Sequence, residues 1–230
     1  MKNLILLAGI AILSASLLSC GSSNDGGMTA VHILVDNTEK SSSRERLVST
    51  EGLLKLIGNN GSVTWQGLNA ASQNRDTTVE MYFPADATGL TKKNIKEPFV
   101  ESLQALKALF LGPVEMQEKD KEGSRLYEPI CRALSDLKTS PANQRVLVIV
   151  SDMIENSPLG SFYKDQPFDK VKEGLSVAMD SLPVKPNVRV VILYDPEGNP
   201  KKQAQFDRSM KIWKQLFAEK KIHYEIKANL

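Results

Sequence analysis

Three largely apolar runs stand out along the chain, and each ends at an acidic residue or a polar pair. They cover residues 28–35, 145–150 and 188–194, and they end at Asp36, Ser151-Asp152 and Asp195. Short apolar runs rich in β-branched residues predict strands that are buried on both faces, as in a parallel sheet. A further short strand is predicted at residues 222–226.

Between these strands the apolar residues recur at helical spacing. The pattern predicts helices over residues 44–57, 95–110, 124–137, 170–182 and 206–217. Two β-rich runs, residues 62–66 and 77–83, flank a polar stretch and predict an antiparallel hairpin. The order β-α-β-β-α-α-β-α-β-α-β predicts one Rossmann-like α/β domain. We expect a doubly wound, mostly parallel six-stranded sheet with one antiparallel edge strand and helices on both faces.

The first 27 residues do not fit this domain. Lys2 precedes a mostly apolar stretch of residues 4–18, which is too short to span a membrane comfortably and has the proportions of a signal peptide. The following Leu-Leu-Ser-Cys-Gly, with Cys20 as its cysteine, resembles the lipobox of bacterial lipoproteins. The resemblance implies a signal peptide at 1–19, a lipidated Cys20 with a flexible tether at 20–27, and a folded domain at 28–230. An ordinary secretory signal with an incidental cysteine is the plainer alternative.

Composition and charge exclude several classes of function. The 29 basic and 27 acidic side chains give a formal charge of +2, which is too balanced for a nucleic-acid binder. Two cysteines and two histidines exclude a disulfide-stapled scaffold and a Cys/His zinc cluster. No phosphate-binding glycine motif or G-x-S-x-G turn follows a predicted strand. Cys131 lies in a helical pattern and is predicted to pack as a small apolar residue.

Carboxylates follow two of the predicted buried strands. Ligand sites in open parallel sheets lie beyond the C-terminal ends of the strands, where Asp36 and Asp152 are expected. Two adjacent carboxylates repel each other unless a positive charge lies between them. A divalent cation such as Mg²⁺ is the usual solution, and Thr38 and Ser124 offer hydroxyl oxygens on nearby loops.

These residues resemble the metal-ion-dependent adhesion site of the von Willebrand factor A domain family. That site is written Asp-x-Ser-x-Ser on a first loop, Thr on a second and Asp on a third. Asp36 and Thr38 match the first two members, Ser124 stands for the Thr, and Asp152 matches the last. The resemblance spans residues 28–227 and implies that these four side chains hold Mg²⁺ or Mn²⁺. It also implies that the domain binds another protein, whose carboxylate completes the coordination.

The motif is degenerate at one position, where Lys40 stands in place of the second serine. Either the loop shifts so that Ser41 reaches the metal, or the Lys40 ammonium replaces the cation between the carboxylates. Capping of a turn or helix is the plainer alternative for Asp36 and Asp152, and Ser124 is expected to be a helix N-cap in either case.

The residues after Asp152 carry further candidates. Glu155 and Asn156 would hydrogen-bond to the site from outside the ligand set. The loop at 152–167 is long and carries Ile154, Phe162 and other aromatic residues, so it is either a partner surface or a segment folded back on the core.

The sequence therefore predicts a lipoprotein of the bacterial cell envelope, anchored to a membrane through Cys20 and facing outside the cytoplasm. Gly21 after the lipidated cysteine favours the outer membrane if the cell has one. The expected partner is another envelope protein, with no nucleic acid and no catalysis. A phosphate-ester hydrolase with Asp36 as nucleophile and a metal-free scaffold with Lys40 in place of the cation are the alternatives.

Overall fold

The computed structural model describes most of the predicted domain. The residues described are 27–38, 44–68, 76–84, 87–112, 124–157, 160–162, 169–170, 173–174 and 187–230. The predicted signal peptide, Cys20, Lys40, Ser41 and most of the predicted helix at 170–182 lie outside them. Within the described residues, no helix combines the length and the apolar character needed to cross a membrane.

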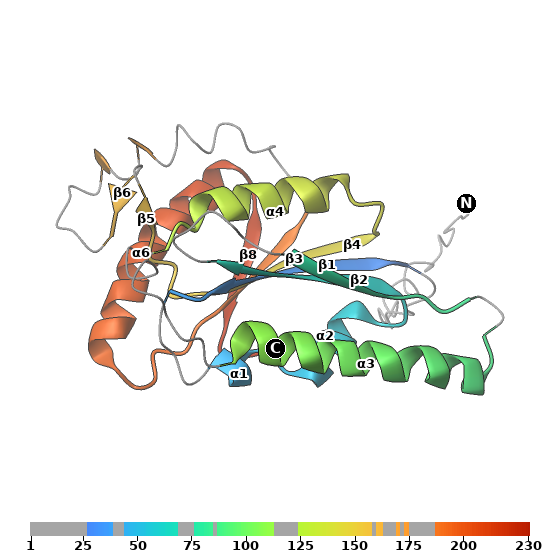
Figure 1. Cartoon of the computed structure of the whole chain (residues 1–230). Helices are drawn as coiled ribbons and strands as arrows, with labels where there is room; N and C mark the ends of the chain where they lie inside the picture. The colour runs from blue at the N-terminus through green and yellow to red at the C-terminus, as the bar shows by residue number, and fades with distance from the viewer. Residues whose placement is uncertain are drawn as a thin grey trace, which may run out of the picture.

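Six strands form one sheet in the order β3-β2-β1-β4-β7-β8 (Figure 1). Their bounds are β1 (Thr29–Asp36), β2 (Gly61–Leu68), β3 (Asp76–Met81), β4 (Gln144–Val150), β7 (Arg189–Leu193) and β8 (His223–Lys227). β3 pairs antiparallel with β2, and all other neighbours in this sheet are parallel. The predicted six-stranded sheet with one antiparallel edge strand is confirmed.

Helices cover both faces of the sheet. They are α1 (Arg44–Leu47), α2 (Thr50–Ile57), α3 (Gly89–Leu111), α4 (Tyr127–Thr139) and α6 (Pro200–Glu219). Figure 1 shows α4 and α6 on one face and α1, α2 and α3 on the other. The α/β class of doubly wound fold is therefore confirmed.

The prediction of one helix over 44–57 is wrong. The chain forms α1 and α2 with a break at residues 48–49, because Ser49 starts a new helix. The Ser49 hydroxyl accepts a hydrogen bond from the Gly52 N–H at 2.8 Å and donates one to the Leu230 carbonyl, also at 2.8 Å. The apolar residues keep helical spacing across the break, so the periodicity alone does not reveal it.

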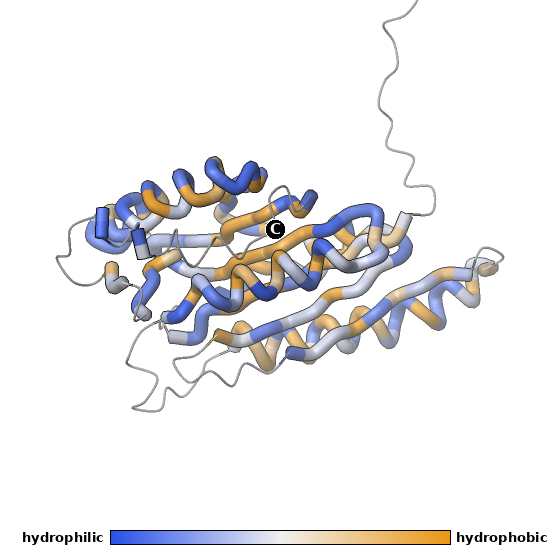
Figure 2. The backbone as a smooth tube through the Cα atoms, turned by 90° about the horizontal axis from the view of Figure 1, so that it is seen from above, coloured by the Kyte–Doolittle hydropathy of each residue, from blue (hydrophilic) through white to orange (hydrophobic). Residues whose placement is uncertain are grey.

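Strand alternation divides the core into two layers. Along β1, Ala30 and Leu34 point to the α4 face, and Val31, Ile33 and Val35 point to the α2–α3 face. Figure 2 shows apolar residues concentrated in the central strands, whereas apolar and polar residues alternate along the helices.

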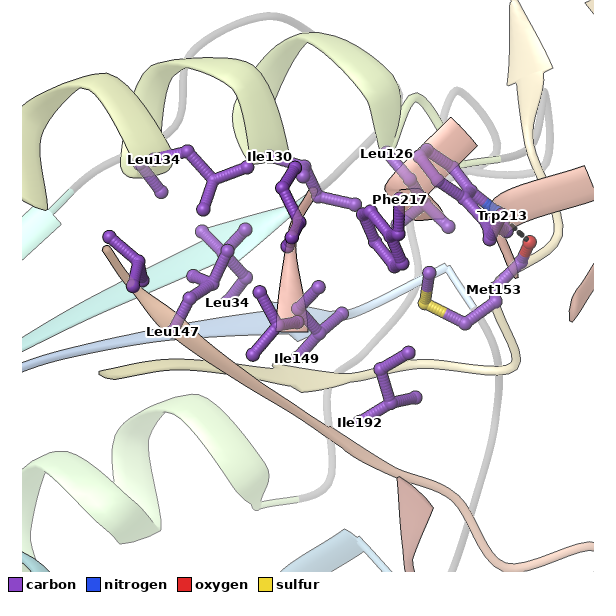
Figure 3. Packing of buried hydrophobic residues seen from close by; sticks show 14 of the residues in the cluster. Leu34, Leu126, Ile130, Leu134, Leu147, Ile149, Met153, Ile192, Trp213 and Phe217 are labelled. Atoms are coloured by element: carbon purple, nitrogen blue, oxygen red, sulfur yellow. Dashed lines mark hydrogen bonds between the residues drawn. The ribbon is translucent and has the colours of Figure 1, made fainter. Parts of the chain in front are cut away.

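On the α4 face, Trp213 of α6 packs fully buried beside Phe217, and its indole N–H donates to the Met153 carbonyl at 2.9 Å (Figure 3). Complete burial of such apolar side chains stabilises the fold by roughly 1.5–3 kcal/mol each. This layer therefore also fixes the chain just beyond β4.

Gly61, the first residue of β2, has no room for a side chain. A Cβ there would overlap the Thr29 carbonyl oxygen and come within 2.5 Å of the Ile57 side chain. We expect Gly61→Ala to lower the free energy of unfolding by about 1–3 kcal/mol, since backbone must move to admit the methyl group. Chemical denaturation measures this.

Gly89 provides the matched control, because nothing lies within 4 Å of a Cβ placed there. Gly89→Ala is expected to be neutral or to stabilise by up to about 1 kcal/mol. Equal losses for the two variants would contradict the steric argument.

Candidate functional site

The register of β1 and β4 places Asp36 beside Ser151. Val35 lies opposite Val150, so the next residues along the two parallel strands, Asp36 and Ser151, are neighbours. Leu34 and Ile149 both belong to the core layer under α4, so two residues further along Asp36 and Ser151 also face that side. The first polar residue after each apolar run therefore points to the start of α4.

The Asp36 carboxylate is 3% exposed and accepts four hydrogen bonds. Its Oδ1 accepts from the Thr38 N–H at 3.0 Å and from the Thr38 hydroxyl at 2.6 Å. Its Oδ2 accepts from the Ser124 hydroxyl at 2.7 Å and from the Ser151 hydroxyl at 2.9 Å. Three separate segments of the chain thus meet on one buried carboxylate.

Of the predicted ligands, Asp36, Thr38 and Ser124 are brought together. The Thr38 and Ser124 hydroxyl oxygens also lie in close contact with each other, while both hydroxyl hydrogens are directed to Asp36. The expectation that Ser124 caps a helix is wrong, because α4 begins three residues later at Tyr127. Ser124 lies in the loop before α4, and its hydroxyl is turned to Asp36 instead.

Asp152 faces a small cavity next to this cluster. Its Oδ1 accepts from the Ile154 N–H at 3.0 Å, which forms a tight turn after β4. The cavity, of about 20 Å³, is lined by Asp36, Ser151 and Asp152, among others. It has room for about one water molecule or one ion. The turn-capping alternative is therefore confirmed for Asp152, and its role as a metal ligand stays a prediction.

Arg44 lines the same cavity and was missed by the sequence analysis. Its side chain is buried, and its Nη1 donates to the Asp36 carbonyl at 2.8 Å and to the Asn37 side-chain oxygen at 3.1 Å. Lys40, the side chain that the sequence suggested as the positive charge near the two aspartates, lies outside the described residues. The sequence does not indicate that Arg44 belongs to the site, because a polar residue at the start of an amphipathic helix is normally exposed to solvent.

Glu155 caps α4 from a distance in sequence. The residue before α4, Leu126, has no side chain that can cap the helix. The fully buried Glu155 Oε2 accepts from the N–H groups of Leu126 and Tyr127 at 2.8 and 2.9 Å. The Asn156 N–H donates to the Ser124 carbonyl at 2.6 Å, so both residues hold the loop of Ser124 in place. A carboxylate at a helix N-terminus is also favoured by the helix dipole.

Burial raises the pKa of the Glu155 carboxyl above its ordinary value of 4.5. The negative charge of Asp36 adds to this rise in pKa, whereas hydrogen bonds from the Ser157 side chain and from the two N–H groups of α4 oppose it. The fold therefore binds a proton at Glu155 more readily than the unfolded chain does.

The segment after Asp152 folds back on the core. Met153 has a positive φ of 61° and a buried side chain, and its carbonyl accepts the Trp213 hydrogen bond. Ile154 is buried, and Phe162 packs against the core layer under α4. Two short strands, β5 (Asn156–Ser157) and β6 (Gly160–Ser161), form a hairpin there. At Ile154 and Phe162 the chain therefore packs on the core, as the fold-back alternative predicts.

Two other reactive side chains lie away from the site. His32 is buried in β1, where its Nε2 bonds to the Gln66 side-chain oxygen at 3.1 Å and burial lowers its pKa. Cys131 packs half-buried against the core layer, and burial raises the pKa of its thiol to about 11. Cys131 therefore packs as the small apolar residue that the sequence predicts.

The donor atoms at the site suit a hard divalent cation. They are carboxylate and hydroxyl oxygens, and the cavity lining contains three acids, Asp36, Asp152 and Asp195, against the one base Arg44. Among the described residues no group of three or more His, Cys, Asp or Glu is arranged to hold a metal. The predicted set differs from such a group because it combines two acids with two hydroxyls.

No protein family model matches the chain, and no curated protein matches it. Among solved structures it is similar to the PilB minor pilin from Streptococcus sanguinis, at 10% identity and a TM-score of 0.46. That match covers 88% of this chain, which spans 57% of the pilin chain. It is also similar to an aerotolerance-related membrane protein from Bacteroides fragilis, solved with multiple mutations to serines. There the identity is 13% and the TM-score 0.40, over 86% of this chain and 91% of the other. At these values neither likeness carries a conclusion about this chain.

The raised pKa of Glu155 predicts a pH-dependent difference between two variants. In Glu155→Gln the neutral amide oxygen still accepts from the helix, but the titration is lost. The stability of the natural chain relative to Glu155→Gln should be greatest below pH 4.5 and decline as the pH rises through the folded pKa. Chemical denaturation of both proteins across this range measures the difference.

Glu155→Ala is the matched comparison, because it removes the cap itself. Relative to Glu155→Gln, it should cost about 1–2 kcal/mol across the whole pH range, because neither variant titrates at this position. A difference between the natural chain and Glu155→Gln that stays flat or grows with pH would refute the assignment.

Proposed function

We propose that this chain is a lipid-anchored envelope protein whose domain, of the von Willebrand factor A type, binds another protein at the edge that carries Asp36. The observation that carries the proposal is the convergence of Thr38, Ser124 and Ser151 hydroxyls on the buried Asp36 carboxylate. A carboxylate so completely surrounded by hydroxyl oxygens, next to a second aspartate, matches the residues that the resemblance assigns to a cation site.

A divalent cation, Mg²⁺ or Mn²⁺, would be held through oxygen by Asp36, Thr38, Ser124 and Asp152. When bound, it supplies a positive charge that a carboxylate of a partner protein can ligate. The chain itself orients the donors: β1 and β4 position the two aspartates, and Glu155 and Asn156 hold the loop of Ser124. Arg44 reduces the negative charge of the cavity without removing its excess of acids.

Binding rather than catalysis is favoured by the state of Asp36. A carboxylate nucleophile needs an accessible lone pair, whereas both Asp36 oxygens already accept two hydrogen bonds each and the residue is buried. The hydrolase alternative would require at least one of these bonds to be given up before attack.

The cation requirement is tested by calorimetry of the purified protein with Mg²⁺ and with Mn²⁺. We expect binding heat in the natural chain and its loss in Asp152→Ala and Ser124→Ala. Ser151→Ala is the matched control, because it removes the same kind of hydrogen bond to Asp36 Oδ2 without removing a proposed ligand. It should retain binding within about tenfold, or about 1.4 kcal/mol.

Absence of heat in the natural chain, with binding gained in Lys40→Ser, would instead establish the metal-free scaffold. Equal loss of binding in Ser124→Ala and Ser151→Ala would show that the network around Asp36 matters rather than the proposed ligands. Turnover of a phosphate ester that is lost in Asp36→Asn would overturn the binding function in favour of hydrolysis.

A photo-crosslinking residue tests the partner itself. Placed at Asn37, half-buried beside the Asp36 network, it should capture one envelope protein in cells, and the product should disappear in Asp36→Asn. The same residue at Lys138, exposed near the far end of α4, is the control and should not give that product. Capture of the same protein from both positions would contradict a site at the Asp36 edge.

A further inference from the structure

The described chain enters the fold at the edge opposite the Asp36 site. The Thr29 N–H donates to the Asn60 carbonyl at 3.0 Å, and the Met28 carbonyl accepts from the Asn143 N–H at 2.9 Å. These contacts lie where the parallel strands β1, β2 and β4 begin. The described chain therefore begins at this edge, which lies on the right in Figure 1.

Two of the most exposed apolar side chains lie at the same edge. Tyr82, just after β3, and Leu90, in the first turn of α3, are each 70% exposed. The Phe83 N–H donates to the Asn60 side-chain oxygen at 2.7 Å, so a single residue joins the Tyr82 segment to the entry point of the chain. In both Figure 1 and Figure 2 the first turns of α3 lie at the end where β1 begins.

Three lysines lie in the first two turns of α3, close to Leu90 in the sequence. Lys92, Lys93 and Lys96 line a shallow pocket together with Phe83 and residues of the turn after α2. Residues 89–97 contain these three lysines and one acid, Glu97, whose carboxylate lies 3.7 Å from the Lys93 ammonium. The local charge is thus +2, three minus one, although the mature chain as a whole is nearly neutral. We name Tyr82, Leu90, Lys92, Lys93 and Lys96 the entry face.

The length of the tether limits how far the entry face can lie from a membrane. From Cys20 to Gly27 there are seven Cα–Cα steps, which reach at most about 25 Å when fully extended. An anchor at Cys20 therefore keeps this edge within that distance of the lipid headgroups. Lysines are attracted to anionic headgroups, and exposed aromatic and aliphatic side chains gain by entering the interface.

We propose that the entry face docks on the anionic surface of the membrane that holds the anchor, an inference that rests on the lipid anchor of the proposed function. The ammonium groups of Lys92, Lys93 and Lys96 lie against the headgroups, and Leu90 and Tyr82 enter the interface. The eight residues of β1, about 25 Å long, then separate the membrane from Asp36. Docking thus fixes the domain with its binding edge turned away from the lipid.

Helix α3 offers a matched pair of positions for the test. Leu90 is 70% exposed and Leu109 is 69% exposed on the same helix, 19 residues or about 28 Å apart along its axis. Each is changed to cysteine in the full chain, with Cys131→Ser present and Cys20 blocked by its lipid. A polarity-sensitive fluorophore is then attached, and the acylated protein is reconstituted in vesicles containing phosphatidylglycerol.

We expect the probe at position 90 to shift to the blue and to be quenched by spin-labelled lipid, and the probe at 109 to behave as in water. Lys92→Gln with Lys96→Gln should lower the ratio of docked to undocked protein about 25-fold, roughly fivefold for each lysine. Vesicles of phosphatidylcholine alone should give a similar loss. These results support the docked orientation.

Equal responses at positions 90 and 109, or a position-90 response that ignores both the lysines and the anionic lipid, would overturn the proposal. The anchor is checked separately by intact mass and by flotation with the vesicles. An unacylated chain would contradict the anchor, and the same two probes on the free chain would still decide whether the entry face binds anionic lipid.

Discussion

The buried carboxylate of Asp36 governs the arrangement of the whole C-terminal edge of the sheet. A carboxylate out of contact with water is costly by several kcal/mol unless hydrogen bonds replace the lost solvent. Here Thr38, Ser124 and Ser151 supply those bonds from three segments that are far apart in sequence. Because removal of any one donor would leave the charge less well solvated, the three loops are held in one position relative to each other.

This constraint also defines what a cation would compete with. Each Asp36 oxygen already accepts two hydrogen bonds, so the edge satisfies itself by hydrogen bonding alone. A bound ion would need hydroxyl hydrogens to turn away so that hydroxyl lone pairs face it. A cation and the hydrogen-bond network are thus alternative ways to stabilise one buried charge, and the positive charge of Arg44 in the same cavity lining would disfavour the cation.

The parts of this fold that depend on burial were open to prediction, and those that depend on local register were not. Buried strands are recognisable in the sequence as apolar runs. The sheet and its antiparallel edge strand could therefore be predicted, and so could the proximity of Asp36, Thr38 and Ser124. Ser151 was missed although it is the first polar residue after its run, as Asp36 is after its own, and counting from the ends of the two runs would have paired them. Glu155 was recognised only as a neighbour of the site, because a carboxylate that caps a helix 28 residues before it in the chain leaves no sequence signal.

The two edges of the sheet differ because parallel strands have distinct ends. Every strand that runs parallel to β1 begins at the edge where the described chain begins and ends at the edge that carries Asp36. The direction of the strands therefore determines which side chains lie at which edge. Carboxylates and hydroxyls gather at the finishing edge, and lysines with exposed apolar side chains gather beside the entry point. The first residue of β1, Thr29, and its last residue, Asp36, lie at these two opposite edges, so the proposed anchor would be attached at the edge away from the site. If the proposed anchor and partner are right, access of the partner to the Asp36 edge would depend on the orientation of the sheet relative to the membrane rather than on the length of the tether.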